Sequence, residues 1–159
     1  MTYVTTVSFF FLLNGEQFDF LRPERGPRQE DPLSPYLFLL CAEAFSSMIR
    51  KAEDEGHIQG VSISKLASRV SHLLFADDTL IFCQATKEAL LCVKYILSAY
   101  EKASGLAINN SKSAMVFSKN VNGTTRETLA QILGVTVIQK HEKYHGLPTV
   151  VGRSKRDVF

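Results

Sequence analysis

The sequence predicts an α+β domain, in which β-hairpins build an antiparallel sheet and helices pack on one of its faces. Three observations lead to this class. The chain has 159 residues, a length that suits one compact domain. Apolar, β-prone runs occur in pairs separated by two or three turn residues. The stretches between these pairs repeat apolar residues at helical spacing, and strand pairs that alternate with helices are typical of the α+β class.

The first strand pair is predicted near the N-terminus. Tyr3 to Leu13 is rich in Val, Thr and Phe, and Asn14-Gly15 follows it directly. Asn and Gly both tolerate the positive φ angles of a two-residue hairpin turn. We therefore expect Glu16 to Leu21 to return as the second strand.

The next element is predicted to be a long helix. Asp31 can cap its free N–H groups, and Pro32 suits its first turn. The apolar residues that recur at helical spacing are Tyr36, Leu37, Leu40, Cys41, Ala44, Phe45, Met48, Ile49 and Ala52. The polar run Glu53-Asp54-Glu55-Gly56 is expected to end this helix.

A second hairpin is predicted at the centre of the chain. Val70 to Phe75 and Thr79 to Cys83 are both β-prone, and Ala76-Asp77-Asp78 separates them. A second amphipathic helix, Glu88 to Ala103, should follow and end at Gly105. Its predicted buried face consists of Ala89, Val93, Ile96, Leu97 and Tyr100.

The C-terminal part is predicted to contain a short strand, Ala114 to Ser118, and a third helix. Thr124 followed by Glu127 is a capping-box pattern. The helix that it opens is expected to run to Leu133 and to end at Gly134. The tail beyond it is expected to be irregular, with one short strand.

Composition is that of an ordinary globular protein. Hydrophobic residues make up 45% and charged residues 21%, with a net charge of +2, which excludes a disordered chain. Lys119 to Phe159 holds seven basic and three acidic residues. This basic segment is compatible with a phosphate-bearing partner and equally with a solvated tail.

The cysteines and the N-terminus bear on where the protein works. Cys41, Cys83 and Cys92 form no CxxC spacing, and each lies in an apolar run. We therefore expect a reducing, intracellular compartment, without distinguishing nucleus, cytoplasm or mitochondrion. The N-terminus lacks a basic n-region, and its apolar stretch is shorter than the ~20 residues that span a bilayer. We expect no signal peptide and no membrane association.

Phe75-Ala76-Asp77-Asp78 is the sharpest chemical feature of the sequence. Two adjacent carboxylates repel each other, and burial beside apolar strands would penalise both. Either the two acids point into water at the tip of a turn, or a divalent cation neutralises them. Asp is a common turn residue, so the pair by itself favours the solvated turn.

Four stretches together resemble a known family, in that family's order. They are Arg25-Gly26-Pro27-Arg28-Gln29-Glu30-Asp31-Pro32-Leu33-Ser34-Pro35-Tyr36-Leu37-Phe38, then Phe75-Ala76-Asp77-Asp78, then Gly105-Leu106-Ala107-Ile108-Asn109 with Lys112-Ser113, and Tyr144-His145-Gly146-Leu147-Pro148. The family is the reverse transcriptases (RNA-directed DNA polymerases) of non-LTR, LINE-type retrotransposons, particularly those of plants. The resemblance covers essentially the whole chain and implies a polymerase palm fold.

The resemblance also implies a cofactor, partners and a catalytic pair. Polymerases of this family use two Mg²⁺ ions for nucleotidyl transfer, with an RNA template and a DNA primer as partners. By resemblance, Asp77 is the main metal ligand and Asp78 is its partner. Magnesium prefers carboxylate oxygens and keeps open water positions, which suits two Asp on a tight β-turn.

Five further residues take roles from the resemblance. Arg28 and Gln29 match positions beside the incoming nucleotide and the template. Lys112 matches a lysine near the leaving pyrophosphate, where it can donate a proton or stabilise charge. Tyr144 and Gly146 match the block that grips the primer. Without the family, Lys112 is an ordinary loop lysine, and Tyr144 is a buried aromatic beside a turn glycine.

The chain also departs from the family pattern. Glu30 stands where Gly is usual and would repel a triphosphate, while Pro27 and His145 each stand where Leu is usual. The third catalytic Asp belongs on a strand before the first hairpin, whereas Asp19 follows that hairpin. We therefore expect residues 1–159 to be a partial palm, without fingers or thumb and inactive on its own.

Two alternatives remain open at this stage. The chain could be a non-catalytic module that binds nucleic acid or a polymerase. It could also be an unrelated α+β domain whose Asp-Asp turn is merely solvated. The sequence leaves the oligomeric state open.

Overall fold

The computed structural model describes residues 9–21, 31–62, 64 and 67–138 and has the predicted α+β class. The helices are α2 (Ser34–Asp54), α3 (Lys87–Ser104) and α4 (Gly123–Leu133). The strands are β1 (Phe9–Leu13), β2 (Glu16–Leu21), β3 (Val61–Ser62), β4 (Arg69–Val70), β5 (His72–Phe75), β6 (Asp78–Ile81), β7 (Ala114–Met115) and β8 (Thr136–Val137). In this part of the chain the strands pair two by two, antiparallel except for the parallel pair β7–β8.

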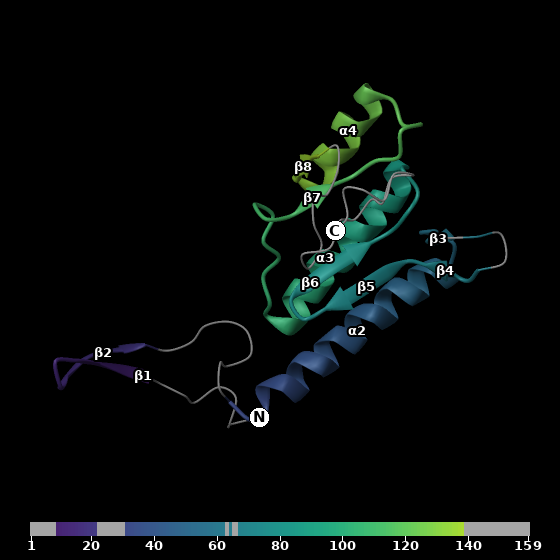
Figure 1. Ribbon diagram of the computed structural model, residues 1–159. Coiled ribbons are helices and arrows are strands. Elements are labelled where there is room, and N and C mark those ends of the chain that lie inside the picture. Colours follow the sequence, from purple (N-terminus) through teal and green to yellow (C-terminus); the bar gives the residue numbers. More distant parts are fainter. Residues whose placement is uncertain (1–8, 22–30, 63, 65–66, 139–159) are drawn as a thin grey trace, which may run out of the picture.

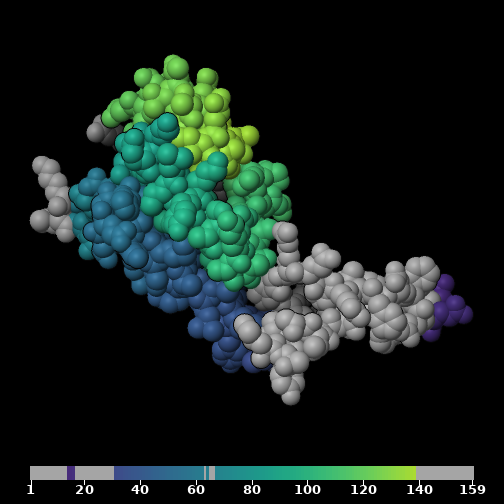
Figure 2. All heavy atoms as spheres, turned by 180° about the vertical axis from the view of Figure 1, so that it is seen from behind, coloured from purple at the N-terminus to yellow at the C-terminus, as the bar shows by residue number. Residues whose placement is uncertain are grey.

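The first hairpin forms as predicted. Leu13 pairs with Glu16, so Asn14 and Gly15 make a two-residue turn, with φ angles of 55° and 87°. Figure 1 shows β1–β2 projecting away from the helices. Figure 2, seen from behind, shows residues 14–16 at the far end from the body that α2, α3 and α4 form.

Helix α2 begins two residues later than predicted, with Leu33 instead of Asp31 at the N-cap. The Asp31 carboxylate accepts a hydrogen bond from the Leu33 N–H at 2.8 Å, and the Asp31 carbonyl accepts one from the Ser34 N–H at 3.0 Å. Asp31 therefore closes a turn ahead of the helix instead of capping it, and Leu33 at the N-cap makes no side-chain cap bond. The helix ends at Asp54, as expected, and Gly56 follows with a φ of 76°.

The core lies between the C-terminal half of α2 and one face of α3. Its buried members are Phe45, Ile49, Ala52, Ile58, Ala89, Val93 and Ile96. The rings of Phe45 and Tyr100 lie 4.8 Å apart between centroids, which places the end of α3 beside the middle of α2. In the N-terminal half of α2, Tyr36 and Leu40 are 67% and 68% exposed, so only part of the predicted apolar stripe is buried.

The three cysteines are free thiols, as expected from their spacing. Cys83 and Cys92 pack against the core. Burial raises the pKa of the Cys83 thiol, and the neighbouring Cys92 raises it further. Burial also raises the pKa of Cys92, followed by the charge of Glu55. Both thiols are therefore protonated at neutral pH and are poor nucleophiles.

A small sheet precedes the central hairpin and was not predicted. Val70 pairs with Val61 in β3–β4, so it does not belong to the strand that leads to Phe75. Gly60, just before β3, lies against the backbone of Val70 and Ser71, and a Cβ at this position would come within 2.6 Å of the Val70 carbonyl oxygen. The close approach requires glycine.

We expect Gly60→Ala to lower the free energy of unfolding by about 1–3 kcal/mol, because backbone atoms of Val70 and Ser71 must shift. Urea unfolding followed by circular dichroism measures the change. Gly123→Ala is the matched control, because a Cβ at Gly123 meets nothing within 4 Å, and its effect should stay within about 0.5 kcal/mol. Equal effects of the two substitutions would contradict the close approach at Gly60.

The C-terminal elements form with different boundaries. The predicted strand at 114–118 is reduced to β7, which pairs with β8, a short strand in the tail beyond Gly134. The N-cap of α4 is Asn122, whose side chain accepts a hydrogen bond from Thr125 N–H at 2.8 Å. The prediction of a capping box that starts at Thr124 is therefore wrong. Gly105 and Gly134 end α3 and α4 with φ angles of 72° and 70°, as expected.

Candidate functional site

The two adjacent carboxylates lie at the tip of the β5–β6 hairpin. Phe75 pairs with Asp78, so the turn contains only Ala76 and Asp77, one residue fewer than predicted. Ala76 has a φ of 49°, which is uncommon for a residue other than glycine. This conformation closes the short turn and makes Asp78 the first residue of β6.

Both carboxylates face solvent. Asp77 and Asp78 are exposed, and so are Leu73, Leu74 and Phe75 on the strand that precedes them. Two hard oxygen donors in adjacent positions suit a hydrated divalent cation that keeps several water ligands. Among the described residues, no group of three or more acidic, His or Cys side chains could hold a metal ion. The described part of the chain therefore supplies two carboxylates and no third ligand.

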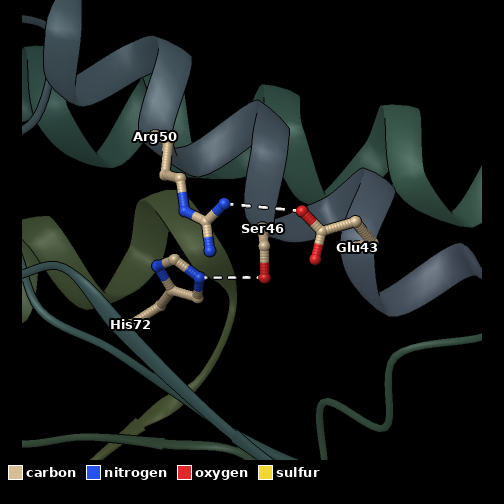
Figure 3. Close-up of polar contacts among 4 residues, drawn as sticks. All are labelled: Glu43, Ser46, Arg50 and His72. Carbon is tan, nitrogen blue, oxygen red and sulfur yellow. Dashed lines mark hydrogen bonds and ion pairs between the residues drawn. The ribbon is translucent and has the colours of Figure 1, made fainter. Parts of the chain in front are cut away.

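A polar cluster lies at the base of this hairpin. His72, the first residue of β5, places Nε2 3.0 Å from the Ser46 hydroxyl on α2 and Nδ1 3.2 Å from the Ser71 hydroxyl. Figure 3 shows the His72 ring against α2, with the Arg50–Glu43 pair on the same helix. The Arg50 guanidinium lies 3.4 Å from the Glu43 carboxylate, and both side chains are exposed.

The surroundings of His72 disfavour its charged form. Burial lowers the pKa of His72 below 6.5, and the positive charge of Arg50 lowers it further. The carboxylates of Glu53 and Glu43 oppose the shift but do not reverse it. The ring is therefore neutral at neutral pH.

This shift predicts a pH dependence of stability. The pKa of His72 in the folded protein lies below the unfolded value of 6.5, so below pH 6.5 the unfolded chain binds a proton more readily than the folded chain does. His72 therefore destabilises the fold as the pH falls from 6.5 through the folded pKa. Above pH 6.5 it has no such effect. We expect the urea midpoint to fall less between about pH 7.5 and pH 5 in His72→Gln than in the wild type. An equal fall in both proteins would show that His72 does not contribute.

Lys112 lies in a separate, exposed turn after α3. The Asn109 side-chain oxygen accepts hydrogen bonds from the N–H groups of Ser111 and Lys112, at 3.1 and 3.2 Å. These bonds fix the backbone of the turn and leave the lysine side chain in solvent. The position is compatible with a role toward a phosphate but does not test it.

The other predicted site residues lie outside the described residues. They are Arg28 and Gln29 beside the nucleotide, and Tyr144 and Gly146 at the primer. Glu30, Pro27 and His145, where the sequence departs from the family pattern, also lie outside them. Their roles therefore remain predictions.

Comparison with known proteins decides the family. Residues 2–137 match the model of the reverse transcriptase (RNA-dependent DNA polymerase) family. The chain belongs to this family. An uncharacterized mitochondrial protein of Arabidopsis thaliana is 49% identical over 69 residues, which are 43% of this chain and 57% of that protein. The retrovirus-related Pol polyprotein from type-1 retrotransposable element R2 of Nasonia vitripennis is 39% identical over 70 residues, 44% of this chain and 6% of the polyprotein.

The resemblance to reverse transcriptases of retrotransposons is thus confirmed, and the alternative of an unrelated α+β domain is wrong. No solved structure matches the chain. The matched segments span little more than half of one relative and a small part of the other. Within the described residues, none of the helices combines the length and the apolar character needed to cross a bilayer.

The sequence did not single out His72 or Ser46. The two residues are 26 positions apart, and neither stands out by type or by spacing. The available signal was one polar residue, His72, directly before the apolar run Leu73-Leu74-Phe75. A polar side chain that becomes partly buried on folding needs a hydrogen-bond partner.

Proposed function

We propose that Asp77 and Asp78 form the carboxylate pair of a reverse transcriptase active site and bind Mg²⁺ at the tip of the β5–β6 hairpin. The observation that carries the proposal is a pair of exposed, adjacent carboxylates, one in the two-residue turn and one directly after it, in a chain of the reverse transcriptase family. The partners are an RNA template and a DNA primer. The donor chemistry suits the cation, because both ligands are hard, exposed oxygens.

The remaining residues complete this proposal. Bound Mg²⁺ would stabilise negative charge on the reacting phosphate. Lys112 would neutralise charge on the leaving pyrophosphate from its exposed turn. Arg28 and Gln29 would contact the nucleotide and template, and Tyr144 and Gly146 would hold the primer. These four assignments rest on the match to the family motif.

We further propose that the chain by itself extends no primer. The described residues offer two carboxylates, and a site for two ions that lacks a shared ligand loses several kcal/mol of transition-state stabilisation. We also propose an intracellular location, which the free thiols support.

Metal binding and primer extension test the two parts of this proposal. Mn²⁺, a paramagnetic substitute for Mg²⁺, should broaden the amide NMR signals of Asp77 and Asp78 before those of other residues, and Mg²⁺ should reverse the broadening. Purified chain with Mg²⁺, an RNA template and a DNA primer should give no extension. Uniform broadening along the chain would refute the metal site, and extension would refute the inactivity.

Nucleic-acid binding without extension, and without Mn²⁺ binding at Asp77 and Asp78, would identify the chain as a non-catalytic binding module. Its affinity should then fall steeply with salt, because contacts to phosphates release counterions.

A further inference from the structure

The β5–β6 hairpin is attached at its base and exposed at its tip. At the base, Ser71 is buried, its carbonyl accepts a hydrogen bond from Phe82 N–H at 2.7 Å, and Ile81 packs against the core. Toward the tip, Leu73 and Phe75 are 47% and 58% exposed. The attachment of the base therefore sets where the turn lies.

The His72 ring joins this base to α2. One ring nitrogen contacts the hydroxyl of Ser46 (Figure 3), and the other contacts the hydroxyl of Ser71. Each of these serines is only 5% exposed. A hydroxyl can donate or accept, so both contacts are satisfied in either neutral tautomer. The ring thus bridges a helix and a strand, and both contacts are partly buried.

We propose that His72 is a positioning residue, which fixes the hairpin to α2 through Ser46 and thereby holds Asp77 and Asp78 in place. This inference rests on the proposed function of the two carboxylates. Three residues of extended chain lie between His72 and the turn, so Ala76 is four steps of ~3.3 Å, about 13 Å, from His72. A rotation of about 10° at the base would move the turn by about 2 Å, and a displacement of about 1 Å can cost ~100-fold in rate.

The charges around His72 agree with this role. Arg50, Glu43 and Glu53 of α2 face the ring, and burial together with Arg50 lowers its pKa. The neutral ring carries one N–H and one acceptor nitrogen, so it can donate to one serine and accept from the other. A charged ring would have to occupy the same partly buried position, next to the positive charge of Arg50.

Ser46→Ala and Ser71→Ala form a matched pair for the test. Each removes one hydroxyl of equal burial, and each removes one hydrogen bond to His72. Only Ser46→Ala removes the bond between helix and strand, because Ser71 is the chain neighbour of His72. Ser46→Thr keeps the hydroxyl on α2 and serves as the rescue variant.

Amide hydrogen exchange of the full, metal-free chain gives the first readout. We expect exchange in a peptide over 72–82 to be about tenfold faster in Ser46→Ala and less than about twofold faster in Ser71→Ala, with α3 unchanged. Ser46→Thr should restore slow exchange. Equal acceleration in Ser46→Ala and Ser71→Ala, or acceleration that extends to α3, would overturn the inference.

Mn²⁺ binding gives the second readout and separates the two proposals. We expect the dissociation constant at Asp77 and Asp78 to rise at least about threefold in Ser46→Ala and to stay unchanged in Ser71→Ala. If the wild type binds no Mn²⁺ but the exchange result holds, the metal proposal fails and the attachment through His72 stands. If Mn²⁺ binds equally well to the wild type and Ser46→Ala, the positioning role is refuted.

Discussion

Ile49→Ala is expected to lower the free energy of unfolding by about 3 kcal/mol. The Ile49 side chain is 1% exposed and lies at the centre of the packing between α2 and α3. Its truncation removes buried methyl groups and leaves a cavity, which costs about 2–5 kcal/mol in well-packed cores. Because small domains are stable by only about 5–15 kcal/mol, the urea midpoint should fall markedly.

Leu40→Ala is the matched control for this prediction. It truncates a branched side chain of the same size on the same helix, but Leu40 is 68% exposed. Its effect on unfolding should stay within about 0.5 kcal/mol. A large loss in Leu40→Ala would show that the N-terminal half of α2 is covered in solution, and a small loss in Ile49→Ala would place the core elsewhere.

Much of the fold follows from local pattern. The apolar repeat in α2 and α3 and the glycines that end α3 and α4 predict these helices almost to the residue. Starts were harder to predict, because several residues near a helix start can cap it. Asp31 and Thr124 both have the right chemistry, yet Asp31 closes a turn, and the cap of α4 is Asn122.

The rest depends on contacts between distant residues. Val70 pairs with Val61 in a small sheet because Gly60 lets two backbone segments approach closely. The local conformational preferences of these residues do not indicate this pairing. Likewise, the sequence indicates the Asp77–Asp78 pair but not the bond from His72 to Ser46 that attaches its hairpin. Local pattern thus indicated the pair of carboxylates to which we assign the proposed chemistry, whereas the attachment of their hairpin could be found only in the structure.

Asp77→Asn is expected to weaken Mn²⁺ binding at the turn by about tenfold or more. Asparagine keeps the shape of the side chain and removes one of two adjacent negative charges. At 4 Å, two unit charges interact by about 4 kcal/mol near a protein surface, and exposure at the turn reduces this value. About 1.4 kcal/mol is enough for a tenfold change in affinity. NMR titration with Mn²⁺ measures it.

Stability should hardly respond to the same substitution. Asp77→Asn relieves repulsion with Asp78 and removes no buried contact, so the free energy of unfolding should change by less than about 0.5 kcal/mol. Asp54→Asn, which neutralises an exposed acid at the end of α2, should change neither stability nor Mn²⁺ affinity at the turn. Unchanged Mn²⁺ affinity in Asp77→Asn would instead mean that the Asp77 carboxylate does not bind the cation. If Asp77→Asn loses Mn²⁺ affinity but folds normally, the loss comes from the missing charge at the tip and not from a change in folding.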